Sequence, residues 1–387
     1  MLTILIFLAV LSVLVIFHEF GHFLMARFFG VKAEEFGLGF PPRAIGFVRD
    51  GGRWKRVKKG DAQSYPSTIW SLNWLPLGGF VRLKGEQNTD NHENDSFASK
   101  SAWARAWILV AGVLMNWLLA ILIFTIGFSV GVPTDLNGLP EGATVKDRHI
   151  EITQVVEGSP AAKAGMLPGD HVTRIGSVGI DTSEAARTEL SKQSKVGESL
   201  TIQVKRDEQM LELVTQPAFI ESIQRAGLGI GLADVGTVRL PVYRAIPQAV
   251  VTTYTFTKLI LSGFWDMLRD LVVSQKTSTE LSGPVGIAVM TGKVAKQGVW
   301  ALAQFAAILS INLAVVNLLP IPALDGGRLV FVFIEVLRRK RRSLVWEARL
   351  HQIGFLLLIS LIILVTAKDL RTYGAPVWQG IKQFVGL

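Results

Sequence analysis

The most constraining feature of this sequence is a metal-binding motif inside a long apolar segment. Residues 2–29 are mostly apolar, yet positions 18–22 read His-Glu-Phe-Gly-His. On a helix, residues four apart share a face, so the two imidazoles can bind one metal ion, and the glutamate between them can act as a general base. Two histidines and a carboxylate are costly inside a membrane, so this pattern indicates a functional site.

Three further apolar segments accompany the first one. They cover residues 102–130, 300–319 and 351–367. About 20 apolar residues cross a bilayer as a helix, so the pattern predicts four transmembrane helices. The first segment could instead be a signal peptide, but it lacks a basic start and a small-residue cleavage site. The chain has no cysteine, so any metal must be held by His, Asp or Glu.

The basic residues predict how the chain is oriented. The net charge is +9, and residues 32–84 and 338–342 carry a clear excess of basic residues, whereas 131–299 is nearly balanced. By the positive-inside rule, both basic segments are cytoplasmic, and the middle segment and both termini are extracytoplasmic. Nucleic-acid binding is the alternative explanation of the basic residues. Because they flank membrane helices, we expect no nucleic-acid partner.

Residues 30–101 predict β-structure at the membrane rather than a helix. The stretch 37–42 is turn-forming, and 71–83 reads as short strands joined by glycines. Irregular backbone at membrane depth requires protein or a wet cavity beside it. One hypothesis is therefore a β-hairpin that lines the active site and pairs with an unwound substrate; the other is an ordinary cytoplasmic β-loop. We expect His92, in the polar stretch 87–96, to be solvated.

The segment between the second and third helices divides in two. Residues 143–235 predict a compact β-rich module with two helices, and 240–299 an amphipathic helical segment on the outer surface. A fifth crossing is disfavoured by Pro247 and Lys258, and it would put the end of the third helix on the wrong side of the membrane. A glycine-rich turn after the module could present N–H groups to a peptide carboxylate. It consists of Gly227, Leu228, Gly229 and Ile230.

Asp325 is the expected third metal ligand. A catalytic zinc site needs three protein ligands, and Asp325 is the carboxylate that follows the third apolar segment. An aspartate before Gly-Gly is also typical of a simple turn. Two prolines, Pro320 and Pro322, should stop or kink the helix before it. Asn116, within the second helix, either bonds a neighbouring helix or supports the metal site.

Together these residues resemble the site-2 protease family of intramembrane zinc metalloproteases, in its bacterial branch. The resemblance rests on 18–22 and on Asn-Leu-Leu-Pro-Ile-Pro-Ala-Leu-Asp-Gly at 317–326, and it extends to 76–80, 111–116 and 282–286. It implies one Zn²⁺ held by His18, His22 and Asp325, with Glu19 as catalytic base. It also implies that 143–235 is a PDZ domain with the glycine-rich turn as its carboxylate loop. Residues implied to contact substrate are Asn312, Asn317, Pro320, Pro322, Gly39 and Phe40.

The resemblance also implies a substrate class. Relatives cleave single-pass membrane proteins already trimmed by another protease, such as anti-sigma factors, and remnant signal peptides. The implied partners are these proteins and the lipid bilayer, and the implied location is a bacterial inner membrane, with the active site toward the cytoplasm. Two departures stand out: the insert fits one PDZ domain where some relatives carry two, and Pro41 replaces a common glycine.

Two other function classes remain. A metal transporter would need polar residues along a whole path, whereas here they cluster at one depth. A catalytically silent PDZ scaffold would not need Glu19.

The predicted fold is a polytopic α-helical membrane protein with four transmembrane helices, a membrane-associated β-hairpin region and an extracytoplasmic β-rich PDZ domain. The predicted segments are a first helix at 1–29, the β region at 30–101, a second helix at 102–130, the PDZ domain at 143–235, the amphipathic segment at 240–299, a third helix at 300–337, a fourth helix at 350–373 and a tail at 374–387.

Overall fold

The computed structural model forms two compact units, residues 1–124 with 249–387, and residues 125–248. It describes residues 2–57, 65–86, 93–136, 139, 143–156, 158–193, 198–206, 209–220, 225–273, 283–338 and 344–385. The expectations for His92 and for the basic residues 339–342 therefore lie outside the described residues, as does Ser282 of the 282–286 motif.

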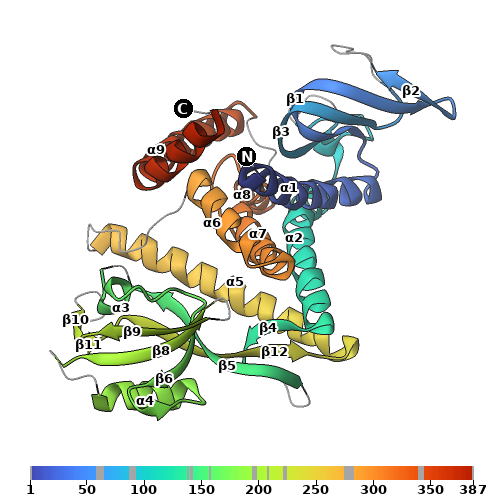
Figure 1. Cartoon of the computed structure of the whole chain (residues 1–387). Coiled ribbons are helices and arrows are strands. Elements are labelled where there is room, and N and C mark those ends of the chain that lie inside the picture. The colour runs from blue at the N-terminus through green and yellow to red at the C-terminus, as the bar shows by residue number, and fades with distance from the viewer. Residues whose placement is uncertain are drawn as a thin grey trace. The chain divides into compact units, whose positions relative to one another are not determined.

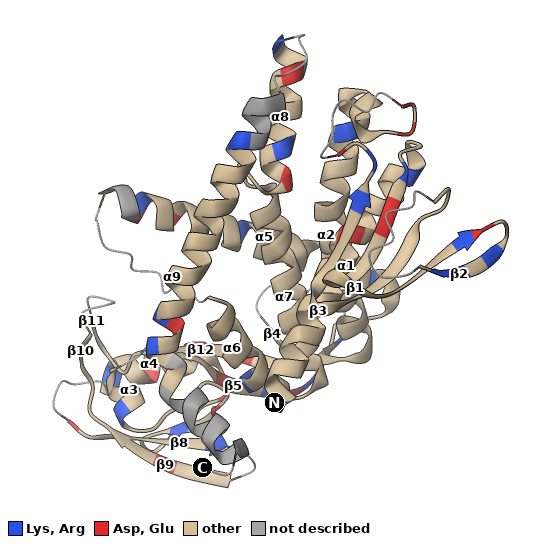
Figure 2. Cartoon of the chain, turned by 90° about the horizontal axis from the view of Figure 1, so that it is seen from above, with Lys and Arg blue, Asp and Glu red and all other residues tan. Residues whose placement is uncertain are grey.

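Four helices among the described residues are long and apolar enough to cross a membrane (Figure 1). They are α1 (Leu2–Phe28), α2 (Ala102–Val130), α7 (Val299–Leu318) and the part of α9 (Leu344–Val385) from Arg349 to Thr372. At 1.5 Å per residue the 27 residues of α1 extend about 40 Å, more than the roughly 30 Å of hydrocarbon. α7 has no charged residue and is tan throughout in Figure 2.

One helix extends beyond its predicted boundaries, and the amphipathic segment contains two helices. α9 is a single helix to Val385, so much of the predicted tail 374–387 continues the fourth apolar helix. Within the predicted amphipathic segment, the described residues form α5 (Val242–Val273) and α6 (Pro284–Lys296). α5 is not among the four candidate spans, in agreement with the expectation of no fifth crossing.

The predicted third helix is interrupted. α7 ends at Leu318 and α8 (Asp325–Arg338) begins seven residues later. Proline lacks an N–H and clashes with the preceding turn, so Pro320 and Pro322 prevent one continuous helix over 300–337. The interruption places Asp325 at the start of α8, where it can turn toward α1.

A three-stranded sheet with the order β2-β1-β3 belongs to the same unit as α1. Its strands are β1 (Ala33–Asp50), β2 (Arg53–Val57) and β3 (Ile69–Leu83), and a short 3₁₀ turn, η1 (Phe97–Ser99), precedes α2. The predicted short strands over 71–83 are instead one continuous strand, because β3 stays paired with β1 at both ends.

The predicted turn at 37–42 lies inside β1. Phe36 and Phe47 both lie opposite Trp70, so the chain changes direction between them without leaving the sheet. Gly39 has φ +78°, a value that side chains other than glycine rarely adopt.

Residues 125–248 form a β-rich unit whose main sheet has the order β4-β12-β5-β6-β8-β9, with β7 beside β6. Its strands are β4 (Val132–Asp135), β5 (Thr144–Val155), β6 (His171–Ile175), β7 (Val178–Gly179), β8 (Leu200–Arg206), β9 (Gln209–Thr215) and β12 (Ile230–Arg239); β10 (Ala218–Ile220) pairs with β11 (Arg225–Gly227). The two predicted helices are α3 (Pro160–Lys163) and α4 (Ser183–Gln193).

The sheet of this unit is larger than the predicted module. β12 continues to Arg239, and β4 pairs with its second half, so residues 132–135 and 236–239 belong to the sheet. β4 is short and contains Pro133, which is tolerated at a sheet edge but gives no strand signal in sequence. The core beneath the sheet contains Ile150, Ile152 and Ile202.

Candidate metal centre

Three side chains from two distant parts of the chain meet beside α1. His18 Nε2 lies 3.0 Å from Asp325 Oδ2, and His22 Nε2 lies 3.2 Å from the same oxygen. The two Nε2 atoms are 3.2 Å apart. Tetrahedral zinc with bonds of about 2.0–2.2 Å needs ligand atoms roughly 3.3 Å apart, so this triangle has the dimensions of a zinc site. Both histidines are only 6% exposed.

The hydrogen bond at the far side of His22 orients its ring for metal binding. Its Nδ1 lies 2.8 Å from the backbone carbonyl of Ile108, which can only accept a hydrogen bond. Nδ1 must therefore carry the hydrogen, which leaves the Nε2 lone pair directed at His18 and Asp325. A metal-ligating histidine usually has this arrangement.

Asn116 occupies the corresponding position behind His18. Its amide nitrogen lies 3.4 Å from His18 Nδ1, and its Oδ1 is buried with no hydrogen-bond partner. The orientation of an amide is decided by its hydrogen-bond network, and exchanging its N and O lets Oδ1 accept from His18 Nδ1–H. The exchange removes the unsatisfied oxygen and frees His18 Nε2 as a ligand. Asn116 is therefore placed to support the metal site, the second of the two roles that the sequence left open.

Two glycines make room for the imidazoles. A Cβ on Gly112 of α2 would lie 2.5 Å from His22 Nε2 and 2.8 Å from His18 Cε1. A Cβ on Gly21 of α1 would collide with the backbone carbonyl of Ala111. The close crossing of α1 and α2 therefore depends on small residues, as helix contacts in membranes often do.

Glu19 is held by the sheet rather than by another helix. The backbone N–H of Val81, on β3, donates to Glu19 Oε2 at 3.0 Å. Gly78 and Gly79 of β3 lie against Val15 and Ile16 of α1. β3 thus runs along the metal-binding turn of the helix, and its backbone fixes the carboxylate that the sequence predicts as the base.

The segment that carries Asp325 is clamped on two sides. Gly326 and Gly327 bring α8 so close to the carbonyls of residues 318–321 that a Cβ on either would collide with them. On α9, His351 Nδ1 accepts a hydrogen bond of 2.9 Å from the N–H of Ala323. A Cβ on Gly354 would lie 2.5 Å from Pro322. These contacts explain how an irregular segment can hold a ligand in place.

The predicted substrate residues near the end of α7 lie in different positions. The Asn317 amide nitrogen is 3.2 Å from His18 Nε2, beside the ligand triangle. Asn312 is five residues earlier, about 140° around the helix, so it does not stack above Asn317. Pro320 is exposed and Pro322 half-buried in the turn before α8.

Phe40 is exposed at an apolar tip of the sheet, and Gly39 beside it is buried. Asn73 Nδ2 donates to the Gly39 carbonyl at 2.9 Å, and Phe40 is 45% exposed. The other large exposed apolar residues of this tip are Leu38, Leu72, Trp74 and Leu75. Such a patch marks contact with lipid or another chain.

The predicted carboxylate loop of the β-rich unit is largely packed. Leu228 is 4% exposed and lies in the core, and its carbonyl accepts from Ala161 N–H. Gly229 has φ +77°, and its carbonyl accepts from Val156 N–H. Gly227 ends β11 and Ile230 begins β12.

Sequence reasoning missed two sets of supporting residues. Arg105 on α2 and Glu335 on α8 form an ion pair of 2.7 Å, largely shielded from solvent. Asn73 and His351 act on the backbone of neighbouring segments. Such residues carry no motif, because their partners are distant in sequence.

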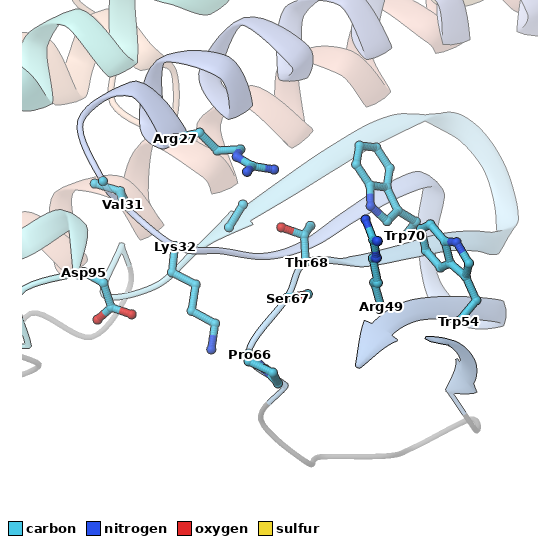
Figure 3. Close-up of a pocket in the computed structure, with 12 residues that line it drawn as sticks. Arg27, Val31, Lys32, Arg49, Trp54, Pro66, Ser67, Thr68, Trp70 and Asp95 are labelled. Carbon is cyan, nitrogen blue, oxygen red and sulfur yellow. The ribbon is translucent and has the colours of Figure 1, made fainter. Parts of the chain in front are cut away.

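A separate cavity of about 590 Å³ lies at the C-terminal end of α1 (Figure 3). Figure 3 shows Arg27, Lys32 and Arg49 around it, with Trp54 and Trp70 at one side. None of the three metal-site side chains lines this cavity, so it is not the catalytic pocket.

Comparison with known proteins gives a consistent family. Peptidase family M50 matches residues 6–57 and 61–361. Zinc metalloprotease RasP of Geobacillus kaustophilus is 31% identical over 452 aligned positions, covering 95% of this chain and 97% of that protein. A Clostridium perfringens protein assigned to the zinc metalloproteases is 32% identical over 361 positions, covering 93% of this chain and 96% of its own.

The solved structures that match cover about a fifth of the chain. The PDZ domain of an SdrC-like protein from Listeria innocua is 24% identical and covers 22% of this chain and 92% of its own, with a TM-score of 0.20.

The site and these relatives define a membrane-embedded class of zinc metalloprotease. The chain belongs to peptidase family M50. Its cofactor is zinc, as the sequence predicted, and the dimensions of the ligand triangle fit that ion.

Proposed function

We propose that this chain cleaves peptide bonds in or near the transmembrane segments of single-pass membrane proteins. The proposal rests on one observation: a zinc-type ligand triangle, with a glutamate beside it, on a helix long and apolar enough to cross a membrane. Site-2 proteases, to which the motifs are similar, act in regulated intramembrane proteolysis. We further propose that it is an endopeptidase of the bacterial inner membrane, with both termini and the β-rich unit extracytoplasmic.

In this mechanism His18, His22 and Asp325 hold zinc, which supplies Lewis-acid polarisation of the peptide carbonyl and lowers the pKa of water. Glu19 takes a proton from the attacking water on a carboxylate oxygen and delivers it to the leaving amine nitrogen. The Val81 N–H holds that carboxylate in position. The Asn317 amide, beside the triangle, is placed to donate to a substrate carbonyl.

A substrate helix must unwind first, because its carbonyls are bonded within the helix. Strand addition to the β1–β3 sheet would replace those hydrogen bonds, and the apolar tip around Phe40 would lie in the lipid interface. We propose that the β-rich unit is a PDZ domain that restricts access to substrates already trimmed by another protease. No nucleic acid takes part.

The test is Glu19→Gln in purified full-length protein reconstituted in liposomes with a single-pass model substrate. Activity should fall by about 10²–10⁴-fold, the usual contribution of general-base catalysis, while zinc content measured by mass spectrometry stays at the wild-type level. Glu184→Gln, on an exposed position of α4, is the matched control and should keep full activity. Cleavage by Glu19→Gln at the wild-type rate would show that the assigned base is wrong.

Trimming is tested separately. The same substrate with a long folded ectodomain should be cut more slowly than its trimmed form. Equal rates would contradict the requirement for earlier cleavage and leave the peptidase assignment intact.

A further inference from the structure

A second group of metal-ligand side chains lies on the sheet of the β-rich unit. His149 and Glu151 are two apart on β5, and His171 lies directly opposite Glu151 on β6. Alternate residues of a strand share a face, and cross-strand partners are neighbours on that face. Ile150, between the first two, points into the core. The three side chains therefore converge on the opposite face of the sheet from that core.

Their ligand atoms are close enough to share an ion. One atom from each of the three lies within 4.8 Å of the other two, and His149 Nε2 is 3.6 Å from Glu151 Oε2. The two imidazole rings are stacked, with centroids 3.8 Å apart and an interplanar angle of 27°. Among the described residues only this group and the metal centre at His18 meet that criterion.

The protonation of His149 can be deduced from its neighbour. Its Nδ1 lies 2.7 Å from the backbone carbonyl of Asp147, which can only accept, so Nδ1 carries the hydrogen. In the neutral ring, Nε2 then has a lone pair. That atom is buried, has no hydrogen-bond partner and faces the Glu151 carboxylate. His149 Nε2 and Glu151 Oε2 are then two acceptors that face each other with no donor between them. A cation bound between the two atoms would satisfy both of them.

The backbone is shaped to make this contact. Lys146 lies opposite Thr237 and His149 opposite Val235, so β5 has one residue more than β12 between these pairs. Asp147, in this bulge, has φ +53°. Bulges commonly redirect a side chain at a site, and here the bulge turns a carbonyl toward His149 Nδ1. The His22 ring of the metal centre is oriented by a backbone carbonyl in the same way.

We propose that His149, Glu151 and His171 form a second metal site that binds a divalent transition ion, with zinc as the favoured ion. Two imidazole nitrogens and one carboxylate oxygen match zinc, whereas calcium and magnesium prefer sets of oxygen ligands. The bound ion links β5 to β6 and stabilises this unit. The role proposed for this ion is structural, and peptide hydrolysis is assigned to the metal centre at His18. The proposal does not depend on the proteolytic function.

The experiment is zinc stoichiometry in full-length protein in detergent, equilibrated at buffered free zinc. All samples carry Glu19→Gln, so that self-cleavage cannot interfere. This parent should bind two zinc ions per chain. The added change Glu151→Gln, close in shape to the native residue, should reduce this to one at the same free zinc, with the affinity of the second site at least about tenfold lower. Glu212→Gln, exposed on β9 of the same sheet, is the control and should keep two.

A second measurement separates loss of the site from loss of the fold. Zinc should raise the melting temperature of a chain that carries Asp325→Asn, because the second site is still present, and it should fail to do so when Glu151→Gln is added. One zinc ion per parent chain, or two in the Glu151→Gln chain, would overturn the proposal. The first result would show that this group binds no metal, and the second would show that the second ion is held without Glu151.

Discussion

Two regions of this protein bring together the same side chains, two histidines and one carboxylate, and do so in different ways. The metal centre places its histidines four apart on a helix and takes its carboxylate from 303 positions beyond His22. The group on the β-rich unit uses alternate positions of one strand and a neighbouring strand only 22 residues after His149.

The difference lies in what surrounds the ligands. At the metal centre, ligand atoms lie 3.0–3.2 Å apart, and β3 holds Glu19 while α7 adds the Asn317 amide. At His149 the same types of ligand lie up to 4.8 Å apart on the face of a sheet. The types of ligand therefore suffice for metal binding. Catalysis also requires a positioned general base, hydrogen-bond donors to the substrate and exclusion of bulk water from the site.

The largest effect should come from Asp325→Asn. Loss of a charged ligand should remove the zinc of the metal centre and reduce proteolysis by at least about 100-fold. Mutating residues that only hydrogen-bond to a metal ligand already lowers metal affinity or activity by about 10–100-fold. Glu151→Gln should leave proteolysis unchanged, since Glu151 is not part of the metal centre at His18. The measurement is zinc content and cleavage rate on the same samples. If Asp325→Asn keeps its zinc and its activity, Asp325 is not a ligand of the catalytic zinc, and the contrast with Glu151 is lost.

Gly112→Ala tests whether the helix crossing shapes the metal centre. The new Cβ would lie 2.5 Å from His22 Nε2, and overpacking of this kind costs about 1–3 kcal/mol. Zinc affinity should fall by about 10–100-fold, as measured by competition with a chelator. Gly263→Ala on α5 is the control, because its Cβ meets nothing within 4 Å. Unchanged zinc affinity in Gly112→Ala would mean that the two imidazoles can shift away from the new methyl group and still bind zinc.

Asn116→Ala removes the side chain behind His18. Zinc affinity should fall by about tenfold, the lower end of the effect of outer-shell partners, because the observed contact is 3.4 Å long. The control is Ser129→Ala on the same helix. The Ser129 hydroxyl donates to the backbone carbonyl of Thr125, so this variant should bind zinc as the wild type does. Equal affinities for the two variants would assign Asn116 to helix packing alone.

The smallest effect concerns the sheet beside α1. Burial raises the pKa of Glu35, but hydrogen bonds from Arg43, together with the charge of Arg82, outweigh it and hold the pKa of this carboxyl below its usual 4.5. A carboxyl with a lowered folded pKa stabilises the fold above the unfolded value and loses that contribution as the pH falls below it. Glu35→Gln should thus cost about 1–3 kcal/mol at pH 7, and less as the pH drops below 4.5.

Thermal melting of full-length protein between pH 3 and 7 measures this effect. Glu34→Gln, one residue away and half-exposed, is the control and should cost less at every pH. A Glu35→Gln penalty that does not shrink in acid would show that the ion pair with Arg43 is not its source.

Much of the fold could be predicted because its signals are local. A run of 27 residues such as α1 is apolar enough to be a membrane helix in any context, and the i,i+4 histidines share a face of any helix. The β-rich module over 143–235 could also be predicted, since the alternation of strands such as β6, β8 and β9 is complete within each strand. Pro320 and Pro322 also predicted that the third helix stops or kinks before Asp325, as it does. β4 was harder to predict, because it is short and its proline weakens the strand pattern.

The sequence by itself determined the ligand types of the metal centre and the position of its base, because the motif at 18–22 and the aspartate before Gly-Gly are short patterns with few other uses in an apolar segment. Only the tertiary structure decided what supports them. The contact of Val81 with Glu19, the bond of His351 to the loop before Asp325 and the meeting of His149 with His171 join elements that no local pattern links. Such contacts depend on how helices cross and strands pair, and that is a property of the packed chain.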